Sequence, residues 1–317
     1  MLDKNSRIYV AGHTGLIGSA FVRILSAAGY NNLIMRSHEQ LELCDSHAVN
    51  QFFESERPEF VILAAGKVGG IHQNQVTPAT FMTANLSIQL NVMQAAQCTG
   101  ARALVMFGSS CMYPKICEQP MDVSKLLSGH PEPTSLSYAV SKLAGVQLCQ
   151  AFNKEYGSTL FLPVIPNSAY GPHDDFNPKT GHVLSALIAR MYQAQTDGSD
   201  SVTLWGTGTP RREFIYSDDI AEAVLYLLSN RNALPDGPVN IGSGVDYSIS
   251  ELAEAIAKTV GFAGTINWDI ERPDGTPQKL LDCGLLRGMG WEPKVDLIAG
   301  LSKAFQWYKK NSAGLND

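Results

Sequence analysis

Short apolar runs alternate with longer amphipathic stretches through the first half of the chain. Four of the runs have strand length and no alternation of polar and apolar side chains, which is typical of strands buried on both faces of a parallel sheet. They are residues 7–11, 32–35, 60–64 and 103–107. The stretches with apolar side chains at helical spacing are residues 19–28, 48–57 and 81–98. Strands and helices in this order predict an α/β fold with a doubly wound parallel sheet.

The pattern loosens after Gly157, where Pro, Gly, His and Asp interrupt it. Further strands are expected at residues 159–165, 214–216 and 239–241, and further helices at residues 183–195, 219–228, 248–260 and 297–309. We therefore predict a first domain over residues 1–165, with returning segments near 214–245. A smaller and less regular second domain is expected mostly over residues 166–317.

Composition and charge narrow the range of functions. The chain of 317 residues is 44% hydrophobic and 17% charged, which is the balance of a folded globular protein. A net charge of -6 without a basic face argues against a nucleic-acid partner. No apolar run approaches the length of a membrane span, no leader segment is recognisable, and the six cysteines include no C-x-x-C pair. We expect a cytoplasmic protein without a membrane segment, a disulfide framework or a metal site.

A glycine-rich loop follows the first predicted strand. It has a G-x-x-G-x-x-G pattern and ends at the first predicted helix. In this position, backbone N–H groups and the positive end of a helix dipole can bind a pyrophosphate. A plain strand-to-helix turn is the alternative, but the place of the loop favours a Rossmann-type dinucleotide-binding domain. The residues expected to line the cofactor there are Gly12, Thr14, Gly15, Leu16, Ile17 and Gly18.

The residues after the second predicted strand bear on the choice between NAD and NADP. An acidic side chain here would bind the ribose 2′-hydroxyl of NAD, whereas this chain has Arg36, Ser37 and His38. Arg36 can bind a 2′-phosphate with help from its two neighbours, so NADP is favoured, and a surface arginine is the alternative. Asp45 has two equally weighted interpretations, a contact with the adenine amino group and an N-cap for the next helix.

Ser109, Tyr138 and Lys142 form a candidate catalytic set. The tyrosine and the lysine are four residues apart, which places them on one face of a helix. A lysine cation is expected to lower the pKa of the phenol, so that the tyrosine can exchange a proton near neutral pH. Ser109 follows the fourth predicted strand, at the sheet edge where ligands bind, and its hydroxyl can hold a substrate carbonyl. The alternative is a surface pair on a helix.

Cys111 and His182 form a second candidate pair. A thiol two residues past Ser109 can act as a base once a nearby cation lowers its pKa. His182 precedes a predicted helix and is expected to face the sheet, and a histidine that titrates near neutral pH is a ready acid. From the residues alone, a buried structural cysteine and a helix-capping histidine are favoured over these roles.

Together these features resemble the extended short-chain dehydrogenase/reductase family, which acts on nucleotide sugars with a Ser-Tyr-Lys set and a bound NAD(P). Four longer segments resemble the members that epimerise and then reduce GDP-4-keto-6-deoxy-D-mannose. They are residues 67–71, 108–115, 170–174 and 272–277. The likeness runs along nearly the whole chain, and the segments that contain Cys111 and His182 are more specific than the glycine loop.

The resemblance implies a two-stage reaction. Cys111 as the base and His182 as the acid would invert two sugar carbons next to the ketone, while Ser109 and Tyr138 stabilise the enolate oxygen. Reduction of the ketone by NADPH would follow, with a proton from Tyr138 and with Lys142 tuning the phenol. Three interpretations compete with this one: a related enzyme for another GDP-4-keto-deoxyhexose, a 4-epimerase that recycles NAD, and a nucleotide sensor without catalysis.

The resemblance also implies further contacts and an oligomer. Additional cofactor contacts are expected from Ala64, Gly66, Lys142, Pro166, Ser168 and His182. The GDP-sugar substrate would be held by Ser110, Asn167, Arg190, Trp205, Arg212 and Asp274. A homodimer is expected through the helix that carries the Tyr-Lys pair and the helix next to it. Apolar residues that would serve this interface, or equally the core, are Leu143, Val146 and Leu148.

Overall fold

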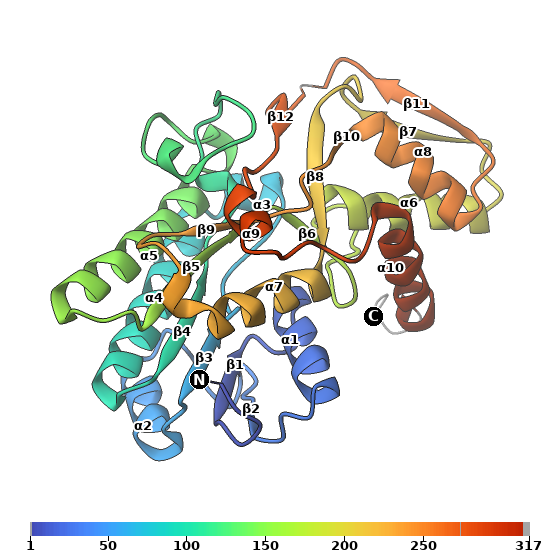
Figure 1. Cartoon of the computed structure of the whole chain (residues 1–317). Coiled ribbons are helices and arrows are strands. Elements are labelled where there is room, and N and C mark those ends of the chain that lie inside the picture. Colours follow the sequence, from blue (N-terminus) through green and yellow to red (C-terminus); the bar gives the residue numbers. More distant parts are fainter. Residues whose placement is uncertain (1, 273, 313–317) are drawn as a thin grey trace.

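The apolar runs of the first half of the chain and one strand of the second half form a six-stranded sheet (Figure 1). The computed structural model describes residues 2–272 and 274–312. The strands are parallel, in the order β2-β1-β3-β4-β5-β9. Their bounds are Ile8–Ala11 (β1), Leu33–Ile34 (β2), Phe60–Leu63 (β3), Ala103–Phe107 (β4), Phe161–Pro166 (β5) and Val239–Ile241 (β9). The predicted α/β class with a doubly wound parallel sheet is confirmed.

Helices cover both faces of this sheet. The bounds of those on one face are Leu16–Ala27 (α1) and Ser217–Ser229 (α7), and of those on the other Ser46–Glu56 (α2), Pro78–Thr99 (α4) and Leu136–Tyr156 (α5). Successive side chains of β1 point to opposite faces, since Ile8 and Val10 pack on the α1 side and Tyr9 packs on the α2 side. Burial on both faces explains why the strands are apolar without alternation.

A second lobe lies beyond the carboxyl ends of the large sheet (Figure 1). In its main sheet, β8 pairs with β10, β12 and β6, while β7 pairs with β11 separately. The strands are Ser168–Tyr170 (β6), Ser201–Trp205 (β7), Arg211–Tyr216 (β8), Asp246–Ser248 (β10), Thr265–Asp269 (β11) and Gln278–Lys279 (β12). The helices that pack on them are Val183–Thr196 (α6), Ile249–Val260 (α8) and Leu297–Asn311 (α10), and the shorter helices α3 (Ile71–Val76) and α9 (Gly284–Gly288) lie elsewhere.

Several elements differ from the expected ones for local reasons. α1 begins at Leu16 because Gly15 takes the N-cap position, and α4 begins at Pro78, whose ring suits the first turn of a helix. β6, β10 and β12 were not expected, because two or three residues carry too little periodicity to be recognised. Within the segment near 214–245, α7 and β9 join the large sheet and its helices, whereas β8 belongs to the second lobe.

The described helices and side chains also bear on membranes, metals and disulfides. Within residues 2–272 and 274–312, none of the helices is both long and apolar enough to cross a bilayer. The same residues contain no group of three or more His, Cys, Asp or Glu side chains placed to hold a metal ion. All six cysteines are free.

Candidate active site

The glycine loop forms a narrow cradle between β1 and α1. Gly12 has φ +78°, a conformation that favours glycine, and a Cβ here would lie 2.8 Å from the Ala65 nitrogen. A Cβ at Gly18 would lie 2.0 Å from the Gly12 carbonyl oxygen. Gly15 is the N-cap of α1, so the first N–H groups of the helix open toward the loop. This close backbone approach fits the pyrophosphate of a dinucleotide. The same loop and first turn contain Thr14, Leu16 and Ile17.

The residues after β2 lie at the surface. Arg36 forms an ion pair with Glu56 of α2, and its guanidinium carbon lies 5.6 Å from the centre of the Phe52 ring. The side chains of Arg36 and Glu56 are both about one-third exposed. Because ion pairs of this kind add little stability, Arg36 can exchange Glu56 for a phosphate at small cost. The side chain of His38 is 81% exposed, and its Nε2 lies 3.3 Å from a carboxylate oxygen of Glu42.

Asp45 is the N-cap of α2. Its Oδ1 accepts hydrogen bonds from the backbone N–H groups of His47 and Ala48 at 2.9 and 3.2 Å. Of the two interpretations of this residue, the structure shows the helix cap, which accounts for an aspartate here without a cofactor.

Asn85, which the sequence did not single out, fixes the loop after β3. Its side-chain oxygen accepts a hydrogen bond from the Lys67 N–H at 3.0 Å, and its side-chain nitrogen donates one to the Lys67 carbonyl at 3.0 Å. Gly66 is thereby held beside Lys142, so that a Cβ at residue 66 would lie 3.4 Å from the lysine Nζ. The signal in the sequence was a polar side chain on a buried helix face, since Asn85 is 1% exposed, and Gln89 one turn further along is buried as well.

The structure brings Ser109, Tyr138 and Lys142 together. Ser109 follows β4 and is the N-cap of a short 3-10 helix, η1 (Ser110–Met112). Its hydroxyl is hydrogen-bonded to the Tyr138 phenol. Lys142 lies one turn further along α5, with its Nζ 5.9 Å from the centre of the Tyr138 ring. Burial lowers the pKa of Lys142 to about 8, because the ammonium loses hydration.

The prediction that the pKa of Tyr138 is lowered is wrong. Burial, followed by the negative charge of Cys111, raises the pKa of Tyr138 above its ordinary value, and the hydrogen bond with Ser109 opposes them without reversing the shift. The charge of Lys142 does not compensate for the lost hydration. The phenol is therefore protonated at neutral pH, which suits a group that donates a hydrogen bond or a proton to a substrate oxygen.

Cys111 lies in η1 among groups that favour its thiolate. Its Sγ lies 3.6 Å from the Lys279 Nζ, and its backbone N–H donates a hydrogen bond to the Ser109 hydroxyl at 3.3 Å. Burial acts to raise the pKa of the Cys111 thiol, but Lys279, Ser109 and His182 together hold it below its ordinary value. A purely structural cysteine does not fit this result, since burial raises the pKa of the core residue Cys149.

His182 is the N-cap of α6, but its side chain does not cap the helix. Its Nδ1 lies 3.8 Å from Asp174, whose other carboxylate oxygen accepts a hydrogen bond from the Ser185 hydroxyl. The Asp174 contact raises the pKa of His182 against the opposing effect of burial, and the negative charge of Cys111 adds to the rise. With the pKa of the cysteine lowered and the pKa of the histidine raised, the two can coexist as thiolate and imidazolium, the forms that a base and an acid require.

The residues expected to hold the sugar nucleotide fall into two groups. Arg212 on β8 is half-buried and lies close enough to Cys111 to interact with its charge. Trp205 at the end of β7 is 68% exposed, with the Arg272 guanidinium 5.0 Å from the centre of one of its rings. These side chains present a cation and an aromatic surface, which suit a diphosphate and a base or sugar ring.

The second group makes hydrogen bonds within the protein. Arg190 donates to the Thr203 carbonyl at 2.6 Å. Asp274 accepts from the Thr207 N–H at 2.9 Å and from its hydroxyl at 2.7 Å. Asn167 is 4% exposed and donates to the buried carboxylate of Glu213. Among the described residues, Ser109, Cys111, Tyr138, Lys142 and His182 thus form one chain of interacting neighbours. The second lobe carries Arg190 in α6, Trp205 at the end of β7 and Asp274 after β11.

A glycine cradle at the start of a doubly wound sheet, with a Ser-Tyr-Lys set at its carboxyl edge, defines a dinucleotide-dependent enzyme of the short-chain dehydrogenase/reductase type. Comparison with protein families agrees with this class. The model of the NAD dependent epimerase/dehydratase family matches residues 8–242, and the chain belongs to that family.

Known relatives cover nearly the whole chain. GDP-L-fucose synthase 1 of Arabidopsis thaliana is 47% identical over 98% of this chain and 95% of its own length. GDP-L-fucose synthase of Escherichia coli (strain K12) is 43% identical over 97% of this chain and 98% of its own length. GDP-L-colitose synthase of Yersinia pseudotuberculosis is 35% identical over 95% of this chain and 97% of its own length.

Solved structures show the same fold. The structure of the GDP-mannoheptose C4 reductase MlghC from Campylobacter jejuni, with NADP bound, is 35% identical and has a TM-score of 0.89. The aligned region covers 98% of this chain and 100% of the reductase chain. A GDP-L-fucose synthetase from Naegleria fowleri bound to NADP is 27% identical, with a TM-score of 0.90 over 99% of this chain and 97% of its own.

Proposed function

We propose that this protein is an NADPH-dependent epimerase/reductase that converts GDP-4-keto-6-deoxy-D-mannose to GDP-L-fucose. The observation that carries the proposal is the pair of Cys111 and His182, whose pKa values are shifted in opposite directions beside Ser109 and Tyr138. A simple reductase needs a proton donor for one oxygen, whereas this pair offers a base and an acid as well. The names of the relatives with the higher identities support the choice of substrate.

In the first stage, the site removes and returns protons at the two carbons that flank the ring ketone. At each carbon in turn, the Cys111 thiolate accepts the proton and the His182 imidazolium supplies one to the other face. Between the two inversions, the thiol releases its proton to solvent and the imidazole takes one up, which returns both groups to their charged forms. Loss of the proton places negative charge on the ketone oxygen, which the hydroxyls of Ser109 and Tyr138 stabilise as hydrogen-bond donors.

In the second stage, the same oxygen takes up a proton. The glycine loop and the segment around Gly66 would hold NADPH, which supplies the hydride for carbon 4 when it is bound. Tyr138 donates its proton to the oxygen, and the Lys142 ammonium stabilises the phenolate that remains. One pocket can serve both stages because each develops charge on the same oxygen atom.

The product identifies the function directly. We expect the purified protein, incubated in deuterated water with NADPH and GDP-4-keto-6-deoxy-D-mannose, to form GDP-L-fucose labelled at carbons 3 and 5, as read by nuclear magnetic resonance. Consumption of NADPH with a 3-deoxy analogue but not with this sugar would favour a colitose-type enzyme, the second candidate that the Yersinia relative supports. Stoichiometric NAD in the purified protein, without net consumption of NADPH, would favour a 4-epimerase.

Arg36 is expected to select NADPH over NADH. Because charge-assisted hydrogen bonds to a phosphate are strong, Arg36→Ala should weaken NADPH binding about 10-fold and leave NADH binding unchanged, as measured by calorimetry. Glu56→Gln is the matched control, since it releases Arg36 from its ion pair and should preserve or tighten NADPH binding. Equal losses for both cofactors in Arg36→Ala would point instead to a role of Arg36 in folding.

A cytoplasmic homodimer completes the proposal. The two long helices α4 and α5 pack side by side, and Leu90 of α4 is 40% exposed, which supports a self-association surface there. Leu143 and Val146 face inward and belong to the core, so of their two interpretations the structure shows core packing. Six free cysteines support a reducing compartment. Sedimentation of the purified protein measures its oligomeric mass.

A further inference from the structure

Lys279 lies at the candidate active site although it is 168 residues away from Cys111 in the chain. It is the second residue of the short strand β12, where it pairs with Arg212 of β8. Its Nζ reaches the Sγ of Cys111 at 3.6 Å. We propose that Lys279 is a positioning residue that keeps Cys111 in the thiolate form, so that the cysteine can act as the base of the proposed epimerisation. The proposal deepens the proposed function and rests on it.

The ammonium of Lys279 has a different kind of partner from the lysine ammoniums that form ion pairs. Lys115, Lys125 and Lys294 each form an ion pair with a glutamate, so their charges are neutralised locally. In the part of the chain that the structure describes, no carboxylate lies within ion-pair distance of the Lys279 ammonium, and its polar contact is the thiol. A cation without a carboxylate partner stabilises an anion beside it more strongly than a neutralised one.

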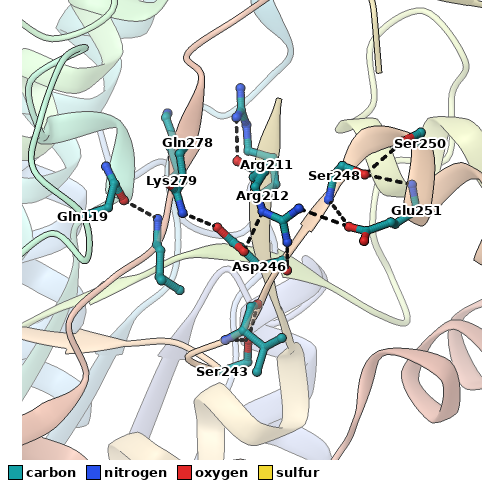
Figure 2. Close-up of polar contacts among 12 residues, drawn as sticks. Gln119, Arg211, Arg212, Ser243, Asp246, Ser248, Ser250, Glu251, Gln278 and Lys279 are labelled. Atoms are coloured by element: carbon teal, nitrogen blue, oxygen red, sulfur yellow. Dashed lines mark hydrogen bonds and ion pairs between the residues drawn. The ribbon is translucent and has the colours of Figure 1, made fainter. Parts of the chain in front are cut away.

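A polar network holds the strand that carries Lys279. Gln278 donates a hydrogen bond to Asp246 of β10 at 2.6 Å, and Asp246 also binds Arg211 of β8 (Figure 2). On the other side, the backbone N–H of Leu280 donates a hydrogen bond to the Gln119 side-chain oxygen at 2.8 Å. Both neighbours of Lys279 are therefore fixed by side chains from other elements, which limits where its own side chain can reach.

A buried carboxylate completes this support. Glu213 is 0% exposed and accepts hydrogen bonds from the Leu281 N–H at 2.9 Å, from the Gly244 N–H and from the Asn167 amide. The Asn167 amide also donates to the Lys279 carbonyl at 3.4 Å. Burying a carboxylate is costly unless donors surround it, and here two of the donors connect it to residues 279–281. Glu213 and Asn167 thus hold Lys279 in place through its backbone.

Charged and titratable groups face Cys111 from every element around it. They are Lys279 on β12, His182 before α6, Tyr138 on α5 and Arg212 on β8. His182 already carries a partner in Asp174, and Tyr138 is a neutral phenol at neutral pH. Arg212 and Lys279 are the remaining cations, and of the two the contact with Sγ is made by Lys279. Burial acts to raise the pKa of the Cys111 thiol, and among the groups that lower this pKa Lys279 has the largest effect.

The test measures the reactivity of Cys111 in the whole protein without substrate or cofactor. The rate of alkylation by iodoacetamide is followed against pH, with the Cys111 peptide quantified by mass spectrometry, because only the thiolate reacts. Lys279→Gln should shift the midpoint for Cys111 upward by about one pH unit and slow its alkylation at neutral pH about 10-fold. Lys279→Arg, which keeps the charge, should restore most of the rate. Lys303→Gln on α10, which removes a lysine packed over Tyr216, should leave the profile unchanged.

Each outcome decides the proposal. An unchanged midpoint in Lys279→Gln, in a variant whose circular dichroism matches the parent, would overturn it. A role limited to substrate binding would raise KM at every pH without altering alkylation. The proposed role lowers kcat at neutral pH and moves the acid limb of the kcat profile to higher pH, while the basic limb, set by His182, stays in place. Since alkylation needs neither the sugar nor NADPH, it can succeed even if product analysis rejects the proposed function, and the two failures are distinguishable.

Discussion

Replacing Cys111 with serine should abolish proton exchange and turnover while NADPH binding persists. A hydroxyl in this place has no accessible anionic form, so Lys279 and His182 have no thiolate to stabilise. General bases typically contribute about 10²- to 10⁴-fold to a rate, and we expect a loss of at least about 100-fold. The measurements are deuterium incorporation at carbons 3 and 5 of the sugar and the steady-state oxidation of NADPH. Calorimetry reports the unchanged affinity for the cofactor, because the glycine loop lies between β1 and α1 whereas Cys111 lies in η1 after β4.

Cys117→Ser is the matched control. Cys117 lies six residues further along, is half-buried, and has a thiol whose pKa is raised by burial. The same chemical change should therefore leave turnover nearly intact there. Normal deuterium incorporation in Cys111→Ser would remove Cys111 from the mechanism, and an equal loss in both variants would indicate damage to the shared segment instead.

The pH dependence of the activity of the unmodified enzyme follows from the pKa shifts of Cys111 and His182. A thiol with an ordinary pKa of 9.0 and an imidazole with an ordinary pKa of 6.5 rarely carry their opposite charges together. Lowering the pKa of Cys111 extends the thiolate to lower pH, and raising the pKa of His182 extends the imidazolium to higher pH. Both shifts enlarge the pH range, near neutral pH, in which Cys111 is a thiolate while His182 is an imidazolium. Activity should fall below this range as Cys111 gains a proton and above it as His182 loses one.

The sequence carried the fold and the local part of the site. The apolar runs that form β1, β3 and β4 can be recognised in the sequence because strands buried on both faces contain few polar residues. The spacing of Tyr138 and Lys142 and the position of Ser109 after a strand place these residues without tertiary information, because each follows from one element.

The rest of the site depends on contacts that no local pattern encodes. Lys279 lies on a two-residue strand and reaches Cys111 only through the pairing of β12 with β8. Asp174 comes close to His182 across a loop, and Glu213 is a charged residue in a strand where an apolar one would be expected. The direction of the Tyr138 pKa was wrong for a related reason: burial decides it, and a spacing of four residues carries no measure of burial.

Replacing Tyr138 with phenylalanine should slow hydride transfer far more than it weakens substrate binding. The variant keeps the ring that packs on Phe81 and loses only the hydroxyl, so the pocket retains its shape while the ketone oxygen loses its proton donor. We expect the single-turnover rate of NADPH oxidation to fall about 10²- to 10³-fold, with a change in KM of only a few-fold.

Because the Tyr138 phenol is protonated throughout the neutral range, its titration should leave no inflection there in the activity–pH profile of the unmodified enzyme. Lys142, whose pKa lies at about 8, loses its charge on the basic side of the same profile. Tyr156→Phe provides the control, because this tyrosine lies at the end of the same helix, is 53% exposed and stacks on Phe152 away from the site. Single-turnover hydride transfer that is unchanged in Tyr138→Phe would assign the proton to another group, and the Ser109 hydroxyl, hydrogen-bonded to the same phenol, would be the next donor to test.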